Sequence, residues 1–299
     1  MSGLHGWIIL DKPLGLGSTQ AVSAIKRGLR TAGLGKAKVG HGGTLDPLAS
    51  GVLPIALGEA TKLAGRMLDS DKVYEFTIRF GEETDTLDAE GQVVATSDIR
   101  PRLAEVEALL PRFTGPIEQV PPSYSALKVD GQRAYDLARA GEAVELATRS
   151  VTIHALAVTR AGDGPLGEAT LTAHVSKGTY IRSLARDVAQ ALGTVGHVTY
   201  LRRIKAGPFD LSQAISLDKW DEAAKARDLE HLLLPLRAGL DDIPAFSLTP
   251  DQAGALRQGR VLAGIAADDG AAFALLDDVP VALVDVCGGE ARVQRGFNL

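Results

Sequence analysis

The chain has 299 residues, a formal net charge of −5 and a single cysteine, Cys287. One cysteine excludes a disulfide framework and a multi-thiolate metal site, and it is typical of a reducing cytoplasm. The negative charge argues against a general polyanion binder, because non-specific affinity for nucleic acids comes mostly from Lys and Arg. No apolar run has the form of a signal peptide or the length of a membrane span. We expect a soluble cytoplasmic protein with one large domain, or one large and one small.

The first part of the chain alternates short strand and helix patterns. A strand is predicted over 6–10, ending at the turn signal Asp-Lys-Pro, and a helix over 19–29 with Ser18 or Thr19 as its N-cap. The next predicted elements are a strand at 52–57, a short helix at 63–68, a strand at 72–80 and a helix at 101–113.

The strand at 72–80 has the clearest pattern of the chain. Its residues alternate strictly, which places Tyr74, Phe76, Ile78 and Phe80 on one face. Ordinary core packing is the simplest interpretation of Tyr74 on this face.

The middle of the chain leaves this pattern and then returns to it. Residues 120–145 contain Pro-Pro, Asp-Gly and a predicted short helix at 135–139, which indicates an excursion from the core. A hairpin is predicted from 151–160 and 169–175, followed by a helix at 181–192 and a strand at 198–204. Paired strands and irregularly placed helices favour an α+β fold with a mixed sheet.

The C-terminal part has a different character. An acidic helical region at 217–236 is followed by short β-like runs at 272–276, 281–286 and 291–294, which suit a small all-β module.

Basic residues gather in two segments despite the negative total. Residues 20–40 contain five Lys and Arg without an acid, and residues 177–205 contain six against Asp187 alone. A solvated surface is the ordinary interpretation of each segment, and a face that binds nucleic acid is the alternative.

Several functional motifs are excluded. The glycines of 162–167 match G-x-G-x-x-G, but they lie in the predicted hairpin turn and no helix follows to bind a phosphate. The chain has no P-loop and no G-x-S-x-G elbow. Its six histidines are scattered without ligand spacing, so the sequence predicts no metal site.

The stretch GHGGTLDPLASGVLP at 40–54 places one carboxylate, Asp46, among glycines and apolar residues. Asp followed by Pro is typical of a helix N-cap, which would make Asp46 structural. The glycine density instead suggests a backbone that something approaches closely. A carboxylate flanked by Leu45 and Leu48 stays ionised only if a cation or hydrogen-bond donors face it, and Arg182 is a plausible partner. That pair would leave a poised nucleophile.

Six blocks in unbroken order, from about residue 6 to residue 210, resemble the bacterial tRNA pseudouridine-55 synthases, the TruB family. They are GWIILDKPLGLGS, KVGHGGTLDPLASGVLPIALGEATK, KVYEFTIRFGEETDTLDAEG, QVPPSYSALKVDGQRAYDLARAG, KGTYIRSLARDV and HVTYLRRIKAGPF. The resemblance implies an isomerase that converts one uridine of the tRNA T loop, position 55, to pseudouridine on a flipped-out nucleotide, without a cofactor or a metal.

The resemblance also implies roles for individual residues. Asp46 matches the nucleophile, Tyr74 the tyrosine that stacks on the base and takes part in proton transfer at C5, and Arg182 the arginine that pairs with the carboxylate. Residues at positions that bind the target nucleotide or wall its pocket are His41, Tyr74, Tyr180 and Leu201. Candidates for contact with the RNA backbone are Lys62, Lys177, Arg202 and Arg203.

The implied architecture is a mixed, mostly antiparallel central sheet with flanking helices. A catalytic domain is expected at 1–240 with an inserted thumb at about 124–148, and a small PUA-like β domain at 243–299 that could contact the acceptor stem. We expect a monomer without an obligatory protein partner or a membrane contact.

Three alternatives stay open at this point. Asp46 could attack C1′ of the ribose or C6 of the base. An Asp-dependent N-glycosidase would use the same carboxylate but release uracil. An RNA-binding chaperone would assist tRNA folding without needing the chemistry, and that role could coexist with the enzyme.

Overall fold

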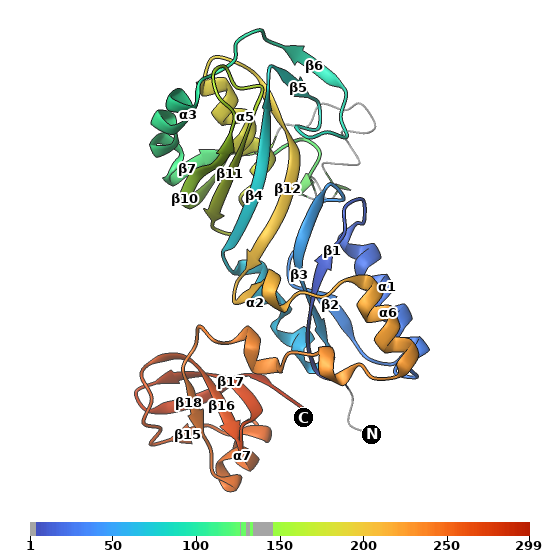
Figure 1. Cartoon of the computed structure of the whole chain (residues 1–299). Coiled ribbons are helices and arrows are strands. Elements are labelled where there is room, and N and C mark those ends of the chain that lie inside the picture. The colour runs from blue at the N-terminus through green and yellow to red at the C-terminus, as the bar shows by residue number, and fades with distance from the viewer. Residues whose placement is uncertain (1–3, 126, 130–131, 134–145) are drawn as a thin grey trace.

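A computed structural model describes residues 4–125, 127–129, 132–133 and 146–299. Its central feature is a curved mixed sheet with the main strand order β1-β3-β12-β4-β11-β10-β7 (Figure 1). In chain order these strands are β1 (Gly6–Lys12), β3 (Ala49–Leu57), β4 (Lys72–Phe80), β7 (Gly115–Gln119), β10 (Arg149–Ala161), β11 (Glu168–Val175) and β12 (Gly196–Ala206). All neighbouring pairs along this path are antiparallel except β3 and β12. The expected α+β class with a mixed, mostly antiparallel sheet is confirmed.

Short strands extend or flank this sheet. β2 (Val39–His41) pairs with β3, and β13 (Phe209–Asp210) pairs with β12. Two small ribbons are formed by β5 (Glu82–Thr84) with β6 (Val93–Thr96), and by β8 (Lys128–Val129) with β9 (Gln132–Arg133). The predicted helix at 135–139 and most of the expected thumb at 124–148 lie outside the described residues.

The helices form where apolar spacing predicted them. They are α1 (Ser18–Thr31), α2 (Ala64–Asp69), α3 (Leu103–Leu109), α5 (Ile181–Ala191) and α6 (Leu217–Ala226). Of these, α1 is longer than predicted, α2 is shifted by one residue, and α3, α5 and α6 are shorter. The predicted helix at 101–113 ends early because a 3-10 turn, η2 (Leu110–Phe113), replaces its last part. In the same way, η4 (Glu230–Leu232) and η5 (Leu236–Gly239) replace the end of the predicted helical region at 217–236. None of the helices among the described residues has the length and apolarity needed to cross a membrane.

The start of α1 differs from the sequence prediction. Its N-cap is Gly17, whose N–H donates to Oε1 of Gln20 at 2.9 Å, and neither Ser18 nor Thr19 holds that position. The hydroxyl of Ser18 is used elsewhere: it donates to the carbonyl of Leu45 at 2.9 Å and accepts from the Leu45 N–H at 2.8 Å. Ser18 therefore ties the helix start to the residue next to Asp46.

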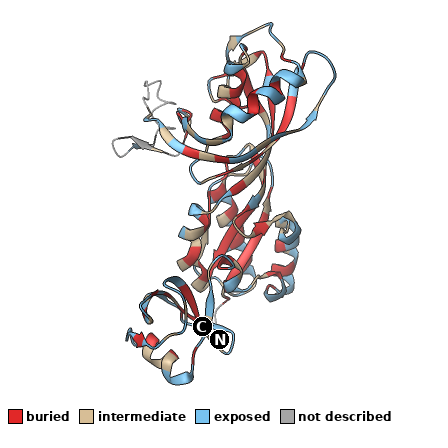
Figure 2. Cartoon of the chain, turned by 90° about the vertical axis from the view of Figure 1, so that its left-hand side faces the viewer, coloured by how far each residue is buried: buried red, intermediate tan, exposed pale blue. Residues whose placement is uncertain are grey.

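Two apolar cores lie on the main sheet. One lies beneath α1, α5 and α6, and includes Ile8, Ile25, Phe76 and Leu184, all fully buried. The buried residues form a continuous band through the sheet (Figure 2). At about 25 cal/mol per Å² of apolar surface removed from water, such side chains contribute about 2 kcal/mol each, so this core fixes the strands that carry the site.

The C-terminal residues form a second, five-stranded sheet in the order β14-β16-β17-β18-β15. Its strands are β14 (Ala245–Ser247), β15 (Leu262–Ala263), β16 (Gly270–Leu276), β17 (Val279–Cys287) and β18 (Glu290–Gly296), with α7 (Pro250–Arg257) beside them. It packs below β1 and β3 (Figure 1) through a core that joins Trp7 to Phe273 and Phe297. The turn η1 (Gly58–Leu63) adds polar contacts, because Glu59 accepts from the Asn298 N–H at 2.8 Å.

Candidate active site

Asp46 lies in a surface pocket between the starts of β3 and β4, the end of β11, the middle of β12 and the start of α5. Tyr74, Tyr180, Arg182 and Leu201 line the same pocket. The structure therefore brings together five residues that were singled out in the sequence and are up to 155 positions apart (46 to 201). His41 is not among the lining residues, within the ranges that the structure describes.

The loop that carries Asp46 does not begin a helix. The Ala49 N–H donates to the Asp46 carbonyl at 3.0 Å, which closes a turn over Pro47 and Leu48, and β3 starts at Ala49. The N-cap interpretation of Asp46 is wrong, since parallel pairing of Ala49 with Leu201 draws the chain into the sheet. The carboxylate is left free of a capping role.

Arg182 is the cation that faces Asp46. Its Nη2 lies 2.8 Å from Oδ2 of Asp46, and its side chain is 6% exposed while that of Asp46 is 42% exposed. The carboxylate thus has a buried charge partner on one side and an open face toward the pocket on the other. An ion pair with this geometry holds the carboxylate in one orientation, which a nucleophile requires.

A second carboxylate, Asp88, holds Arg182 from the opposite side. Its Oδ2 lies 3.2 Å from Nη1 of Arg182, and both side chains are almost fully buried. The remaining guanidinium donors reach the carbonyls of Thr86 at 2.9 Å and Tyr124 at 3.0 Å. Because Nη1 and Nη2 have two partners each, the guanidinium of Arg182 is fixed before substrate arrives. Asp88 was not singled out in the sequence, because its burial depends on the turn Asp85-Thr86-Leu87-Asp88, in which Leu87 has φ 61°.

The start of α5 is fixed by a buried glutamine. Gln119 of β7 is fully buried; its Nε2 donates to the Tyr180 carbonyl at 3.1 Å and its Oε1 accepts from the Tyr180 N–H at 2.8 Å. Tyr180 is the N-cap residue of α5, so Gln119 positions both this aromatic ring and Arg182. Burial raises the pKa of the Tyr180 phenol, which keeps it neutral at physiological pH.

Tyr74 and Leu201 form the apolar wall. Tyr74 is half-buried near the start of β4 and packs against the core, so core packing and a pocket position are compatible for this ring. Leu201 of β12 is 9% exposed and pairs with Phe76 across the strands. Aromatic and aliphatic surface of this kind suits a planar base removed from its stack.

His41 lies on β2, opposite Ile55, and is half-buried. Burial, followed by the nearby charge of Arg203, lowers the pKa of the His41 imidazole. The ring is therefore neutral near pH 7.

Arg203 is not available to an RNA phosphate, contrary to the sequence expectation. It is 1% exposed, and its guanidinium donates to the carbonyls of Val52 at 2.7 Å, Thr44 at 3.2 Å and Gly43 at 3.4 Å. The adjacent Arg202 lies on the other strand face and pairs with Asp11 at 2.8 Å. Sequence alternation could not tell which of the two arginines points inward, and Arg203 proves to be the internal support of the Asp46 loop.

Lys62 and Lys177, the two lysines among the candidates for contact with the RNA backbone, also have protein partners. Lys62 lies 2.6 Å from Glu59, donates to the Gly296 carbonyl at 2.8 Å and joins η1 to the C-terminal segment. Lys177 pairs with Asp69 at 2.9 Å, but both side chains are more than 60% exposed. A pair so exposed contributes little to stability, so Lys177 can exchange its partner for a phosphate.

The glycines around Asp46 make room for the protein itself. A Cβ on Gly42 would lie 2.4 Å from Cβ of Met67, and one on Gly51, with φ +100°, would lie 2.2 Å from the Arg203 carbonyl oxygen. The close approach expected from the glycine density is therefore real at these two positions, but the approaching group is the protein's own chain rather than RNA.

Two buried lysines border the site and were not predicted. Lys72 lines the pocket and donates to the carbonyls of Met67, Leu68 and Ser70 at the end of α2. Burial lowers the pKa of Lys72 to about 8. Burial also lowers the pKa of Lys12 to about 8, against the opposing effect of Asp46. Lys12 and Lys72 therefore lose their charge at moderately alkaline pH.

Comparison with solved structures shows a shared fold. The structure described as "Crystal Structure of a Cbf5-Nop10-Gar1 Complex" is 25% identical with a TM-score of 0.73, covering 98% of this chain and 85% of that one. Because nearly the whole chain is matched, the likeness extends over the C-terminal sheet and is consistent with the expected PUA-like character. This is the fold of pseudouridine synthases, with an arginine-paired aspartate in its cleft.

Sequence comparisons agree with the structure. The family described as "TruB family pseudouridylate synthase (N terminal domain)" matches residues 30–181, and "tRNA pseudouridylate synthase B C-terminal domain" matches 182–241. The protein named tRNA pseudouridine synthase B of Novosphingobium aromaticivorans is 67% identical over 99% of this chain and 98% of its own length. That of Zymomonas mobilis subsp. mobilis is 63% identical over 99% and 96%. The chain belongs to the TruB family of pseudouridine synthases, which are isomerases.

Proposed function

We propose that the protein converts the uridine at position 55, in the T loop of tRNA, to pseudouridine, with Asp46 as nucleophile. The observation that carries this proposal is the pair between the half-exposed Asp46 and the buried Arg182 at 2.8 Å, in a pocket walled by Tyr74 and Leu201. The names of the relatives support tRNA as the substrate.

In the proposed reaction the target nucleotide leaves its stack and enters the pocket. Unstacking costs a few kcal/mol and is easiest in a loop whose bases are already strained. Tyr74 lies against the base and Leu201 excludes water from its edge. Stacking on an aromatic ring is worth about 1–3 kcal/mol, which offsets much of this cost.

Asp46 then forms a covalent bond to the substrate, at C1′ of the ribose or at C6 of the base. In both routes the N1–C1′ bond breaks, the uracil turns, C5 bonds to C1′ and the bond between Asp46 and the substrate breaks, which regenerates the carboxylate. The proton on C5 then leaves, and we assign its removal to Tyr74, directly or through water. Throughout, Arg182 stabilises the charge of the carboxylate as it is consumed and regenerated.

RNA outside the pocket is held by exposed cations and by shape. Lys177 lies between the pocket residues Ser176 and Gly178 and is exposed. Arg202 is partly exposed on the opposite face of β12, and Lys62 is near the C-terminal sheet. We propose that Lys177 and Arg202 contact the T stem-loop backbone and that a PUA-like domain, which we assign to 243–299, approaches the acceptor stem. A cytoplasmic monomer without an obligatory protein partner fits this role.

Product analysis tests the proposal directly. A T stem-loop RNA with tritium at C5 of the target uridine is incubated with the enzyme, and the RNA is then digested to nucleosides. We expect tritium in water and one pseudouridine per RNA. Free uracil would indicate an N-glycosidase instead, and RNA binding or folding without tritium release would indicate a chaperone; either result contradicts the proposed reaction.

A further inference from the structure

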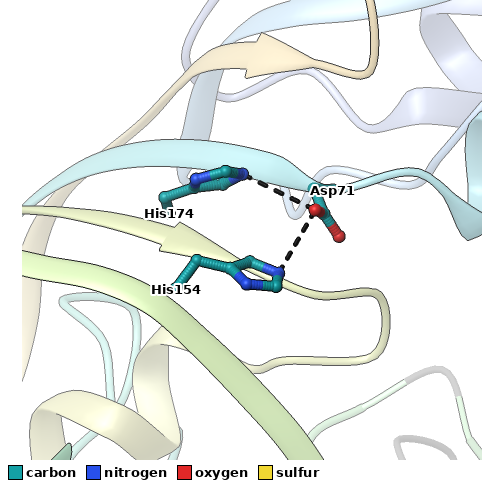
Figure 3. A group of neighbouring side chains, drawn as sticks. All are labelled: Asp71, His154 and His174. Carbon is teal, nitrogen blue, oxygen red and sulfur yellow. Dashed lines mark ion pairs between the residues drawn. The ribbon is translucent and has the colours of Figure 1, made fainter. Parts of the chain in front are cut away.

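Two histidines and an aspartate form a cluster on the main sheet, away from Asp46. Nε2 of His154 lies 3.2 Å and Nε2 of His174 lies 3.7 Å from the same oxygen, Oδ2 of Asp71 (Figure 3). The three possible ligand atoms all lie within 4.8 Å of one another. His154 and His174, which no ligand spacing in the sequence relates, are therefore brought together at one carboxylate by the fold.

Sheet register explains how residues 20 positions apart meet. His174 lies on β11, opposite Val73 of β4 and Ala155 of β10. The register of β10 shifts between Ile153 and Ala155, so His154 lies in a bulge and its ring turns toward Asp71. The ring centroids of the two histidines are 4.7 Å apart.

Asp71 faces the two histidine rings, and a hydrogen bond of its backbone holds it there. It lies between α2 and β4, and its carbonyl accepts from the Gly207 N–H at 2.9 Å. It is followed by Lys72, whose ammonium is fixed by carbonyls at the end of α2. The carboxylate therefore stands at a fixed place in front of the two rings.

A simple ion-pair interpretation does not fit this arrangement well. Two protonated imidazoles would place two positive charges against one carboxylate oxygen, with their rings in contact. Neutral imidazoles, by contrast, can both direct a lone pair toward one ion. Two histidines and one carboxylate are a donor set that suits Zn²⁺ and the neighbouring divalent transition metals.

We propose that Asp71, His154 and His174 bind one divalent ion of the Zn²⁺ class, with water at the fourth position. Tetrahedral bonds of about 2.0–2.1 Å separate neighbouring ligand atoms by about 3.3 Å. The two observed separations to Asp71 bracket this value, and all three side chains are between 37% and 47% exposed, so an ion can enter and the rings can adjust.

An ion at this position would stabilise the strands beside the Asp46 pocket. Asp71 is followed by Lys72 and His174 by Val175, and both following residues line the Asp46 pocket. A bound ion would clamp β4, β10 and β11 to one another at this wall. It takes no part in the reaction of Asp46, and the two proposals stand or fall independently.

Metal titration of the purified chain tests the inference. The protein is freed of metal with a chelator and titrated with Zn²⁺ against a chromophoric competitor, and separately with Co²⁺ to read the coordination geometry from its visible absorption. We expect one ion per chain and a tetrahedral Co²⁺ spectrum. Since loss of an outer contact already costs 10–100-fold in affinity, loss of a ligand in His154→Ala or His174→Ala should cost about 100-fold.

His231→Ala is the matched control, because this exposed imidazole lies 3.2 Å from Asp228 and, among the residues that the structure describes, belongs to no cluster of three possible metal ligands. It should leave the affinity unchanged. Zn²⁺ at 100-fold excess over its Kd should also raise the Tm of the parent chain by about 5 °C and leave the Tm of Asp71→Asn unchanged. The inference is overturned if the parent chain binds Zn²⁺ no more tightly than His154→Ala does, or if the Co²⁺ spectrum is octahedral.

Discussion

Arg182 and Asp88 form a buried ion pair directly behind the Asp46 carboxylate, with Nη1 of Arg182 3.2 Å from Oδ2 of Asp88. The pair makes the guanidinium a fixed bridge between two carboxylates, one buried and one open to the pocket. Asp88 itself is held by Thr86 and by the Glu90 N–H, which donate to its Oδ1. The orientation of Asp46 therefore depends on Arg182 and Asp88, and of these three residues only Asp46 is expected to touch the substrate.

Replacing Arg182 by lysine should break this bridge. A single ammonium cannot match the two carboxylates that the planar guanidinium serves, and it leaves the carbonyls of Thr86 and Tyr124 with fewer donors. We expect Arg182→Lys to lower kcat by about 100-fold and the free energy of unfolding by about 3 kcal/mol. Single-turnover tritium release and urea unfolding measure the two effects; an unchanged kcat would show that Arg182 does not position the carboxylate.

Asp88→Asn tests the buried end of the network separately. The change removes a charge but keeps the shape, so Arg182 loses one of its two anions and should shift toward Asp46. We expect kcat to fall by about tenfold with little change in KM, because the substrate does not touch Asp88. Asp85→Asn in the same loop, where the side chain is exposed, is the control and should retain activity. Equal losses in the two variants would argue for a loop effect and against the network.

Lys72 predicts a dependence of stability on pH. The pKa of Lys72 is about 8 in the folded chain and 10.5 by its ordinary value, so between these limits the unfolded chain binds the additional proton. The contribution of Lys72 to the free energy of unfolding therefore rises as pH rises from about 8 to about 10.5, by at most about 3 kcal/mol. Urea unfolding of the parent chain and of Lys72→Met measures it: the parent should gain stability relative to the variant between pH 8 and pH 9.5. The low pKa of Lys72 is contradicted if the stability of the parent chain relative to Lys72→Met stays constant or falls over this pH range.

The fold followed from local patterns more readily than the site did. Strict alternation at 72–80 gave β4 with the predicted bounds, and apolar spacing indicated α1 and α5. Local sequence could not tell that Ser18 would bond the Leu45 backbone instead of capping α1, because that choice depends on a partner 27 residues away. The inward face of Arg203 was hidden for the same reason, since it depends on the parallel pairing of β12 with β3.

The candidate site was predictable as a set of residues but not as a network. The family resemblance indicated Asp46, Tyr74 and Arg182, and the structure places them around one pocket. Asp88 and the cluster at Asp71 carry no sequence spacing that distinguishes them from surface acids. Asp88 stands out only because it is buried, and the cluster at Asp71 only because strand register brings its histidines together.

Lys177 should contact RNA through charge alone. Lys177→Ala is expected to weaken tRNA binding uniformly across T-loop sequences and to reduce the slope of log K against log salt by about 0.7–0.9. Lys225→Ala is the matched control, because Lys225 is an exposed lysine on α6, outside the residues that line the pocket. Filter binding at several salt concentrations gives both slopes. An equal change in the two variants would mean that Lys177 acts only through the net charge of the protein.

The central claim is that the Asp46 carboxylate is the nucleophile, and tritium release by Asp46→Asn tests it most directly. The amide keeps the size of the side chain but cannot attack, so release from C5-labelled T-loop RNA should fall by about 10⁴-fold or more while tRNA binding persists. Asp163→Asn, an exposed acid in the β10–β11 turn, serves as the control and should behave as the parent chain. Full activity of Asp46→Asn, after mass spectrometry has excluded deamidation back to aspartate, would contradict the account.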